Sequence, residues 1–322
     1  MATQNTQSDN QAASQSEDKS ENKGKAKANR MDLTAATADR FDLYLRSVQE
    51  AEAEVTFFDR VFQDTFGRTP MTLREDFCAA AAVCCEWARS HKERTAVGYD
   101  LDPDTLEWCR KYNLPKLHKQ EQQRVTLRME DVRIVTDEKS DIIAAENFSF
   151  FFFMTRDELR DYFKVAYQNL PEQGLFVLDM MGGPETWTAD QEDVRKVKIP
   201  AGSYPGIEYS KGVSPNGLPQ YNKGSFKYVW EQHHIDPITH DCTFFIHFRF
   251  KDGTEIKKAF EYNWRLWTLP EVREIMIEAG FPKADVYWEG AGEDGEGDGE
   301  YVKTHNAECE AAWIAYVVGV KG

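Results

Sequence analysis

One short stretch of the sequence constrains the fold more than any other. It runs from Leu73-Arg-Glu-Asp-Phe-Cys through four alanines to Trp87, and Ala96-Val-Gly-Tyr-Asp100 follows. This order predicts a strand, a turn of small residues, a helix and a second strand that ends in a carboxylate. Small residues let a backbone turn approach a ligand closely, and the helix N-terminus behind the turn favours negative charge. Because the acid at the second strand end is placed to accept hydrogen bonds from ribose hydroxyls, the stretch indicates a nucleotide-type ligand.

Strand-like and helical segments alternate through the first half of the chain. Helical spacing runs from Phe41 to Glu50 and again through Val55 to Phe62. Beyond it we expect strands at 71–74, 96–99, 125–129, 141–145 and 175–179, and helices at 80–90, 102–112 and 155–170. The run Phe150 to Phe153 is expected to be buried core at the end of the fourth strand. This alternation predicts a parallel sheet with helices on both faces.

The pattern changes after Met181. Residues 182–225 are rich in Gly, Pro and polar residues and predict mostly loop with short strands. Alternating runs at 226–235, 242–250 and 255–267 predict an antiparallel meander, followed by a helix at 269–279 and strands at 284–288 and 311–320. The Gly/Asp/Glu segment 290–300 is expected to be a mobile loop. We therefore expect an α/β domain made of 31–181 and 268–322, an inserted β-rich substrate or cap region at 182–267, and a disordered tail at 1–30.

Charge and cysteine content narrow the function. The chain carries 55 acidic and 39 basic residues, a formal net charge of −16, which argues against a general nucleic-acid binder. Its six cysteines form no Cys-x-x-Cys pair, so neither a zinc site nor a redox motif is suggested, and no metal is expected. Histidines 233, 234, 240 and 247 are irregularly spaced and predict ordinary surface or hydrogen-bonded side chains. With no signal peptide and no membrane-length apolar run, we expect a cytoplasmic protein.

In these residues the chain resembles the class I S-adenosylmethionine-dependent methyltransferases. It is most similar to a bacterial small-molecule-type group whose first motif is Leu73-Arg-Glu-Asp-Phe-Cys78 in place of an acidic residue and Gly-x-Gly-x-Gly. The resemblance covers about residues 40 to 320. It implies a Rossmann-like sheet, mostly parallel with an antiparallel last strand, and S-adenosylmethionine as cofactor. It also implies methyl transfer by in-line displacement to a small-molecule acceptor, with amines among the candidates.

The resemblance assigns the cofactor-binding positions. Glu75 takes the acidic position that supports the turn and the cofactor's amino end. Asp100 takes the ribose hydroxyls, and Leu101 would line the adenine. Asp131 would lie near the adenine amino group, with Val132 beside the ring. The turn beneath the methionine part would consist of Phe77, Cys78, Ala79, Ala80 and Ala81.

Fewer residues are indicated on the acceptor side. The segment Ala145-Glu-Asn-Phe148 follows the fourth strand, where the family places residues between cofactor and acceptor. Candidate orienting or catalytic groups are Tyr44, Glu146, Asn147 and His247, and Asn147 is also a candidate cofactor contact. The meander is rich in aromatic residues that could meet a sulfonium or an amine by cation–π attraction, pack on the sheet or form a dimer contact. These residues are Tyr228, Trp230, Phe244, Phe245, Phe248, Phe250, Tyr262, Trp264 and Trp267.

One departure from the family keeps other functions open. No glycine stands at 77–81, and alanine makes a positive φ costly. Either the turn uses conformations that alanine tolerates, or the chain is a degenerate methyltransferase-like protein that binds a ligand without turnover. A nicotinamide dehydrogenase would need Gly-x-Gly-x-x-Gly after the first strand, which is absent. An RNA or protein methyltransferase is not supported either, because Glu146-Asn-Phe-Ser149 replaces an Asn-Pro-Pro-Tyr-type motif. The sequence leaves open a monomer or a homodimer.

Overall fold

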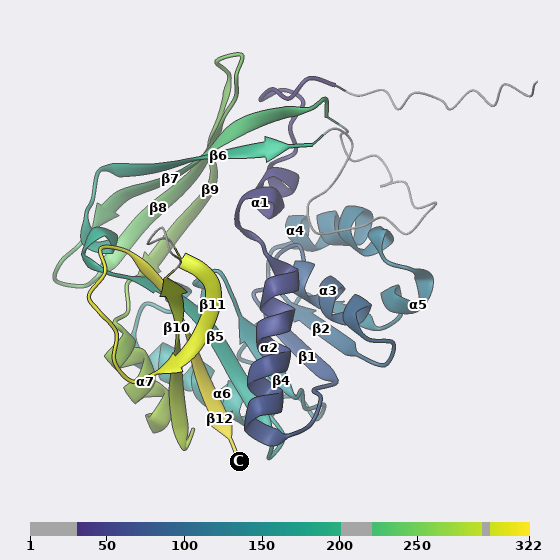
Figure 1. Ribbon diagram of the computed structural model, residues 1–322, viewed down its shortest axis with the longest axis vertical. Coiled ribbons are helices and arrows are strands. Elements are labelled where there is room, and N and C mark those ends of the chain that lie inside the picture. The colour runs from purple at the N-terminus through teal and green to yellow at the C-terminus, as the bar shows by residue number, and fades with distance from the viewer. Residues whose placement is uncertain (1–30, 201–220, 292–296) are drawn as a thin grey trace, which may run out of the picture.

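Two sheets organise the protein. The computed structural model describes residues 31–200, 221–291 and 297–322. Within these residues, an eight-stranded sheet has the order β11-β10-β12-β5-β4-β1-β2-β3, and a four-stranded antiparallel sheet has the order β6-β7-β8-β9 (Figure 1). The strands are β1 (Thr72–Asp76), β2 (Thr95–Tyr99), β3 (Val125–Arg128), β4 (Ile142–Ala145), β5 (Gly174–Gly182), β6 (Gln191–Ile199), β7 (Gly224–Ile235), β8 (Asp241–Arg249), β9 (Glu255–Arg265), β10 (Lys283–Ala291), β11 (Gly297–Thr304) and β12 (Trp313–Lys321).

The large sheet is parallel where the sequence alternates and antiparallel at its C-terminal strands. β1 pairs in parallel with β2 and β4, and β4 pairs in parallel with β5. The last strand, β12, is antiparallel to both β5 and β10. All four residues of β4 are buried, as expected for a strand covered on both faces. The fold is thus mixed α/β with a mostly parallel central sheet and a separate antiparallel sheet, as the sequence predicts.

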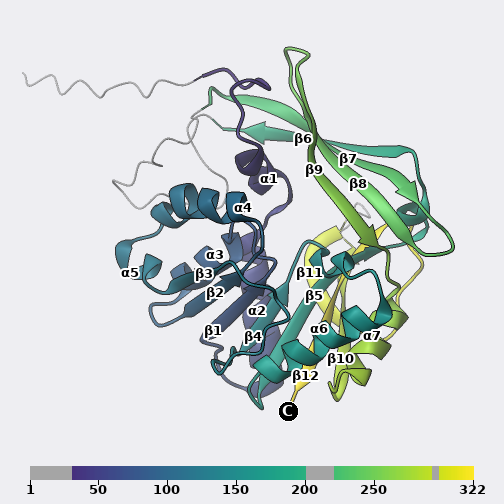
Figure 2. The same cartoon turned by 180° about the vertical axis from the view of Figure 1, so that it is seen from behind.

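Helices cover both faces of the large sheet (Figures 1 and 2). On one face, α2 and α3 share a core with the sheet through Phe58, Phe62 and Trp87. On the other face, Phe163 of α6 and Ile275 of α7 enter a second core. The helices are α1 (Arg40–Val48), α2 (Ala51–Phe66), α3 (Ala82–Ser90), α4 (Pro103–Trp108), η1 (Cys109–Asn113), η2 (Leu114–Lys116), α5 (Lys119–Gln122), η3 (Ser149–Phe152), α6 (Arg156–Asn169), η4 (Pro184–Trp187) and α7 (Leu269–Glu278).

The small sheet lies beyond the carboxyl ends of β1, β4 and β5, with α1 against it (Figure 1). Leu43 of α1 packs with Ile199, Phe226 and Phe248 of this sheet. The N-terminal helix α1 therefore shares its core with the β-rich region, and the domain boundaries at 182 and 267 stay a prediction.

Several elements differ from the sequence expectation. The helix predicted to reach Tyr112 leaves α-geometry after Trp108 and continues as a π-helix. Segment 290–300 is not wholly loop, because β11 begins at Gly297 and pairs with β10 across a bulge. Phe152 of the expected core run is 54% exposed, since η3 turns it away from Phe150 and Phe151. The predicted tail 1–30, part of the loop at 182–225 and residues 292–296 lie outside the described residues.

Two further findings concern the described residues alone. None of their helices is both long and apolar enough to cross a membrane. They also contain no group of three or more His, Cys, Asp and Glu side chains arranged to hold a metal ion.

A buried ion pair ties β1 to the segment after β3. Arg74 Nε donates to Asp76 Oδ1 at 2.6 Å, and Tyr162 of α6 donates to Asp76 Oδ2 at 2.9 Å. The guanidinium also donates to the Val132 carbonyl at 2.5 Å. Both charged side chains are at most 2% exposed. The pair fixes the end of β1 at the point where the turn of small residues begins.

We expect Arg74→Met to lower the free energy of unfolding by about 3–5 kcal/mol, because it leaves a buried Asp76 carboxylate without its cation. Urea unfolding measures the loss. The matched control is Arg160→Met, which removes an exposed pair with Asp157 and should cost less than about 1 kcal/mol. Equal losses in the two variants would contradict the role assigned to Arg74.

Candidate functional site

A cavity lies between the carboxyl ends of the parallel strands and the small sheet. Its volume is about 460 Å³, within the range of small-molecule sites. The strand ends and the turns after them contribute Glu75, Phe77, Cys78, Ala79, Ala80, Asp100, Glu146 and Asn147 to its lining, and α1 contributes Tyr44. The structure thus brings together nine of the residues that the sequence singles out.

The turn after β1 takes up left-handed backbone conformations without glycine. Phe77, Ala79 and Ala81 have φ values of 57°, 46° and 51°. A left-handed residue other than glycine costs roughly 1–2 kcal/mol. Ala79 and Ala80 line the cavity, whereas Ala81 is fully buried outside its lining. The alanine methyl groups therefore leave the cavity open, and the missing glycines show up as backbone strain.

Two carboxylates hold this turn in place. Glu75 Oε2 accepts from Cys84 N at 2.8 Å, which satisfies a free N–H in the first turn of α3. Asp100 Oδ2 accepts from Ala79 N at 2.7 Å, and its Oδ1 accepts from Asp102 N at 2.9 Å. Each oxygen of Asp100 keeps a further lone pair for a ligand. Two of the three acids predicted to bind the cofactor thus also shape the turn that would receive it.

The turn after β4 is strained in the same way. Asn147 and Phe148 both have left-handed φ, 58° and 59°. Asp179, near the end of β5, accepts from Phe148 N at 2.9 Å, and Asn147 Nδ2 donates to Gln49 Oε1 at 3.2 Å. These contacts fix the backbone directly after Glu146 and direct that residue and Asn147 to the cavity.

Four carboxylates gather near these strand ends, and the described residues give none of them a basic partner. Glu146 is 5% exposed, and neither of its carboxyl oxygens has a hydrogen-bond partner among the described residues. Burial raises the pKa of Glu54 and Glu146, and the charge of Asp179 adds to both shifts. The pKa is about 8 for Glu54 and about 7 for Asp179 and for Glu75, with burial as the main cause in each. Burial thus favours the protonated form of each of these acids.

Aromatic side chains from α1 and β9 cover the acids. Phe41 and Tyr44 line the cavity from α1, and Phe260, Tyr262 and Trp264 line it from β9. The Arg40 guanidinium lies 4.7 Å and 5.4 Å from the ring centroids of Phe41 and Phe260. Of the aromatic residues that the sequence offers as a substrate wall, Tyr262 and Trp264 line the cavity. Phe244 and Phe248 pack in the cores, and Phe245 lies under the Lys258 ammonium on the outer face.

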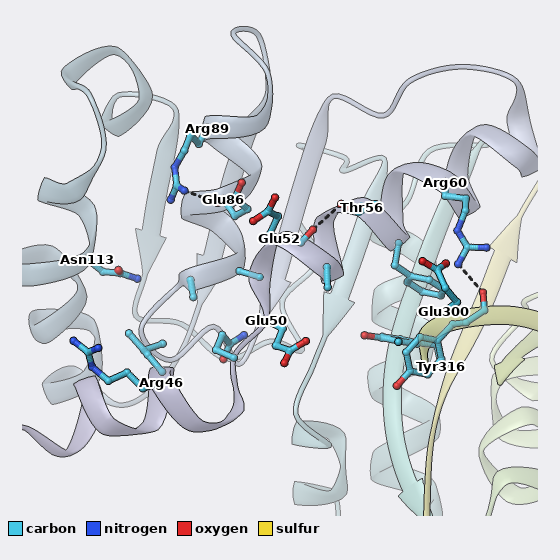
Figure 3. A pocket seen from close by; sticks show the side chains of 18 of the residues that line it. Arg46, Glu50, Glu52, Thr56, Arg60, Glu86, Arg89, Asn113, Glu300 and Tyr316 are labelled. Atoms are coloured by element: carbon cyan, nitrogen blue, oxygen red, sulfur yellow. Dashed lines mark hydrogen bonds and ion pairs between the residues drawn. The ribbon is translucent and has the colours of Figure 1, made fainter. Parts of the chain in front are cut away.

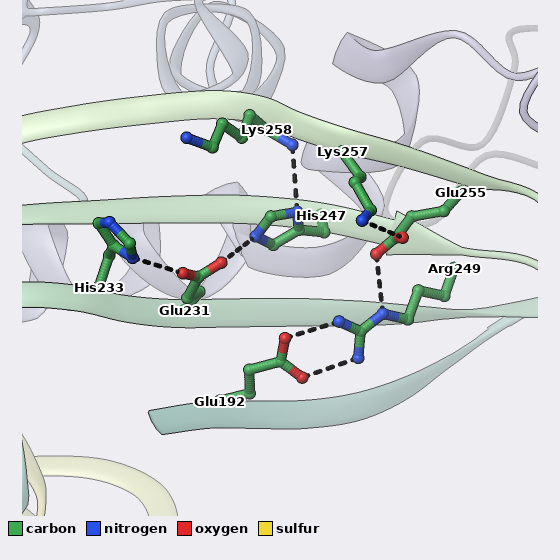
Figure 4. A network of polar contacts seen from close by, with 8 residues as sticks. All are labelled: Glu192, Glu231, His233, His247, Arg249, Glu255, Lys257 and Lys258. Atoms are coloured by element: carbon green, nitrogen blue, oxygen red, sulfur yellow. Dashed lines mark hydrogen bonds and ion pairs between the residues drawn. The ribbon is translucent and has the colours of Figure 1, made fainter. Parts of the chain in front are cut away.

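Besides Ala81, four predicted site residues lie outside the lining. Leu101 is 59% exposed, and Val132 is buried in the core. Asp131 forms an ion pair with Arg133 at 2.7 Å, and hydrogen bonding from Arg133 lowers its pKa. His247 lies on the outer face of the small sheet, where its Nε2 is 2.7 Å from Glu231 Oε2 (Figure 4). The His247 side chain points away from the cavity because side chains alternate along a strand and its neighbours in β8 face inward.

A second cavity of about 600 Å³ lies on the other side of Gln49, at the N-terminus of α2 (Figure 3). Its lining mixes acids such as Glu50, Glu52 and Glu300 with Arg60 and the Glu86–Arg89 pair. None of the predicted site residues belongs to it. The smaller cavity is lined by the strand-end acids and by the turn of small residues after β1, so we take it as the candidate site.

Sequence reasoning misses two acids of the cluster. Asp179 directly follows the buried run Leu175 to Leu178, and an acid at the end of a buried parallel strand is a signal that could have found it. Glu54 lies among the apolar residues of α2 and gives no such signal, because one acid on a helix face is ordinary.

Comparisons with known proteins agree with this geometry. The chain matches no family model and no curated protein sequence. Among solved structures, Streptomyces venezuelae DesVI is similar with a TM-score of 0.59 at 17% identity, over 88% of this chain and 99% of that chain. CalS10, an amino pentose methyltransferase from Micromonospora echinaspora solved with S-adenosylmethionine, has a TM-score of 0.57 at 14% identity, over 86% of this chain and 95% of that chain. The sugar N-methyltransferase KedS8 from Streptoalloteichus has a TM-score of 0.55 at 13% identity, over 97% of this chain and 99% of that chain. The likeness shows that the protein has a Rossmann-like methyltransferase fold.

We expect Ala79→Gly to raise the free energy of unfolding by about 0.5–1 kcal/mol, because relief of left-handed strain exceeds the added entropy of the unfolded chain. Ala80→Gly, at the next residue of the same turn and without a positive φ, should lower it by about 0.5–1 kcal/mol. Chemical denaturation of both variants gives the comparison. A loss in both would show that Ala79 carries no strain.

The buried acids predict a particular dependence of stability on pH. Because the pKa of Glu54 lies at about 8 in the folded protein and near 4.5 ordinarily, its favourable contribution is present at low pH and is lost as the pH rises through about 8. Glu54→Gln should therefore gain stability relative to the natural protein between pH 5 and pH 8.5, at a rate of at most about 1.4 kcal/mol per pH unit. Urea unfolding across this range tests it, with exposed Glu52→Gln as the control that should stay flat.

Proposed function

We propose that the protein is an S-adenosylmethionine-dependent methyltransferase, of the group with a Leu-Arg-Glu-Asp-Phe-Cys first motif, that acts on a small-molecule acceptor. The observation that carries the proposal is the position of Asp100. Its carboxylate lies at the end of β2, lines the cavity and braces Ala79 of the small-residue turn. An acid so placed suits ribose hydroxyls, and the open turn suits the methionine part.

The side chains that line the cavity fit this cofactor. Of its acids, Asp100 suits the ribose hydroxyls, and Glu75 suits the positive charge of the methionine ammonium group. When bound, the cofactor supplies an electrophilic methyl group. The chain's part is then to align the acceptor with that group and to exclude water, which can lower the barrier by at most about 7–11 kcal/mol.

The adenine end of the proposed site differs from the family expectation. Asp131 would have to turn from Arg133 to reach the adenine amino group, and exposed Leu101 would become covered by the ring. Phe152, which is exposed and lines the cavity, offers an additional aromatic surface for a base.

The second candidate function is a methyltransferase-like ligand-binding protein without turnover. The alanine-filled turn favours it, because Ala79 and Ala81 hold left-handed φ values that glycine would adopt without cost. Release of S-adenosylhomocysteine against a broad acceptor panel, amines included, separates the two functions. Binding without any release would favour the second.

We expect isothermal titration to detect S-adenosylmethionine binding and no NAD binding. Asp100→Asn should weaken S-adenosylmethionine binding by on the order of 10- to 100-fold, because a hydrogen bond to a charged group contributes about 1.5–3 kcal/mol. Asp104→Asn is the control, since Asp104 is exposed on α4 outside the cavity lining. NAD binding, or an unchanged affinity in Asp100→Asn, would refute the proposal.

A further inference from the structure

Glu146 is a buried acid that the fold leaves without a partner among the described residues. It is 5% exposed and lines the cavity, and neither carboxyl oxygen has a hydrogen-bond partner there. A buried polar group without a partner normally destabilises a fold. The strained turn at Asn147 and Phe148, held by Asp179, keeps this acid in place. Such an arrangement indicates that a ligand completes it.

The surroundings of Glu146 favour a cation. Glu54 from α2, Asp179 from β5 and Glu75 from β1 all add negative charge near it. Tyr316 of β12, Tyr301 of β11 and Tyr162 of α6 are close enough to these acids to feel their charge, and the pKa of each is raised, first by burial. No ion pair or hydrogen bond of the four acids within the described residues involves a basic side chain. The cluster would gain a counter-ion from an ammonium, but not from an alcohol.

The aromatic side chains that line the cavity from α1 and β9 are also suited to an ammonium. Tyr44, whose pKa burial raises, is near enough to Asp179 and Glu54 to feel their charges. Tyr262 and Trp264 stand beside it, with ring centroids 4.4 Å apart. Arg40 already lies on Phe41 and Phe260, and the Lys258 ammonium lies 3.9 Å from the Phe245 ring on the outer face. The rings of Tyr44, Tyr262 and Trp264 therefore remain for a ligand cation.

We propose that Glu146 is the specificity-determining residue of an ammonium subsite, and that the acceptor is a small primary or secondary amine held between Glu146 and the rings of Tyr44, Tyr262 and Trp264. This inference rests on the proposed function, because it takes S-adenosylmethionine to be the molecule bound next to the amine. It assigns Glu75 and Asp100 to the cofactor and Glu146 to the acceptor. Arg40 and Lys258, the basic residues of the cavity lining, lie on the Phe41 and Phe245 rings and form no ion pair with the four acids among the described residues. An acceptor hydroxyl would therefore leave these acids without a positive charge in contact.

The test uses cyclohexylamine, a protonated ring amine, and cyclohexanol, its neutral counterpart of similar shape. Each is titrated by ligand-observed NMR into the full-length protein, with and without saturating S-adenosylhomocysteine. We expect the amine to bind the natural protein more tightly than the alcohol. Glu146→Gln should weaken the amine on the order of tenfold or more and leave the S-adenosylhomocysteine affinity within about threefold. Glu52→Gln, an exposed acid of α2, should change neither.

Folding does not obscure this test. Glutamine is close in size and shape to glutamate, and the thermal midpoint of Glu146→Gln checks that the fold persists. Glu146→Asp keeps the charge and should bind the amine better than Glu146→Gln, a rescue that a merely structural role would not give.

Each outcome decides between the two proposals. If the natural protein binds cyclohexylamine no better than cyclohexanol in either condition, or Glu146→Gln binds it equally well, the ammonium subsite is wrong. If Glu146→Gln instead loses S-adenosylhomocysteine and keeps the amine, Glu146 belongs to the cofactor and the assignment is also wrong. If S-adenosylhomocysteine does not bind the natural protein while the amine binds through Glu146, the proposed function fails and the subsite stands.

Discussion

Carboxylates that accept backbone N–H groups hold the two turns on which the candidate site depends. Asp100 accepts from Ala79, Glu75 from Cys84 and Asp179 from Phe148. Each bond runs from a strand end to a turn or helix start beside it, so the parallel order of β2, β1, β4 and β5 is what brings donor and acceptor together. The left-handed residues in these turns are unfavourable by themselves. They persist because charge-assisted hydrogen bonds to these acids are among the stronger ones in proteins.

The same acids set the electrostatics of the cavity. Burial raises the pKa of Glu54, Glu75, Glu146 and Asp179, so a positive charge nearby would stabilise the ionised forms of these acids. A bound cation favours their ionised forms, which accept hydrogen bonds more strongly than the protonated forms. Ligand binding would thereby tighten the turns that create the site. The strain of the glycine-free turn and the surplus of buried acid are therefore linked.

The sequence predicts the sheet well because its signals are local. Apolar runs such as Ile142 to Ala145 and caps such as Thr155 with Glu158 each specify one element, and parallel pairing then follows from their order. Glu75 and Asp100 could be placed because each ends a strand. β11 could not, because Gly297 to Thr304 lacks apolar alternation and is a strand through its pairing with β10. Side-chain direction was equally out of reach, as Leu101 on the surface and His247 on the outer face illustrate.

The position of the small sheet explains why the acceptor side is harder to infer than the cofactor side. The proposed cofactor positions lie within a few residues of β1 and β2, whereas the proposed acceptor side combines α1, β9, the turn after β4 and the end of β5. Residues far apart in the sequence, such as Tyr44 and Tyr262, meet there only because α1 packs on the small sheet. A change in the packing of α1 would therefore alter the acceptor side while leaving the strand-end acids in place. Under the proposed function, this separation would let the large sheet keep the same methyl donor while changes in the small sheet and α1 alter the acceptor.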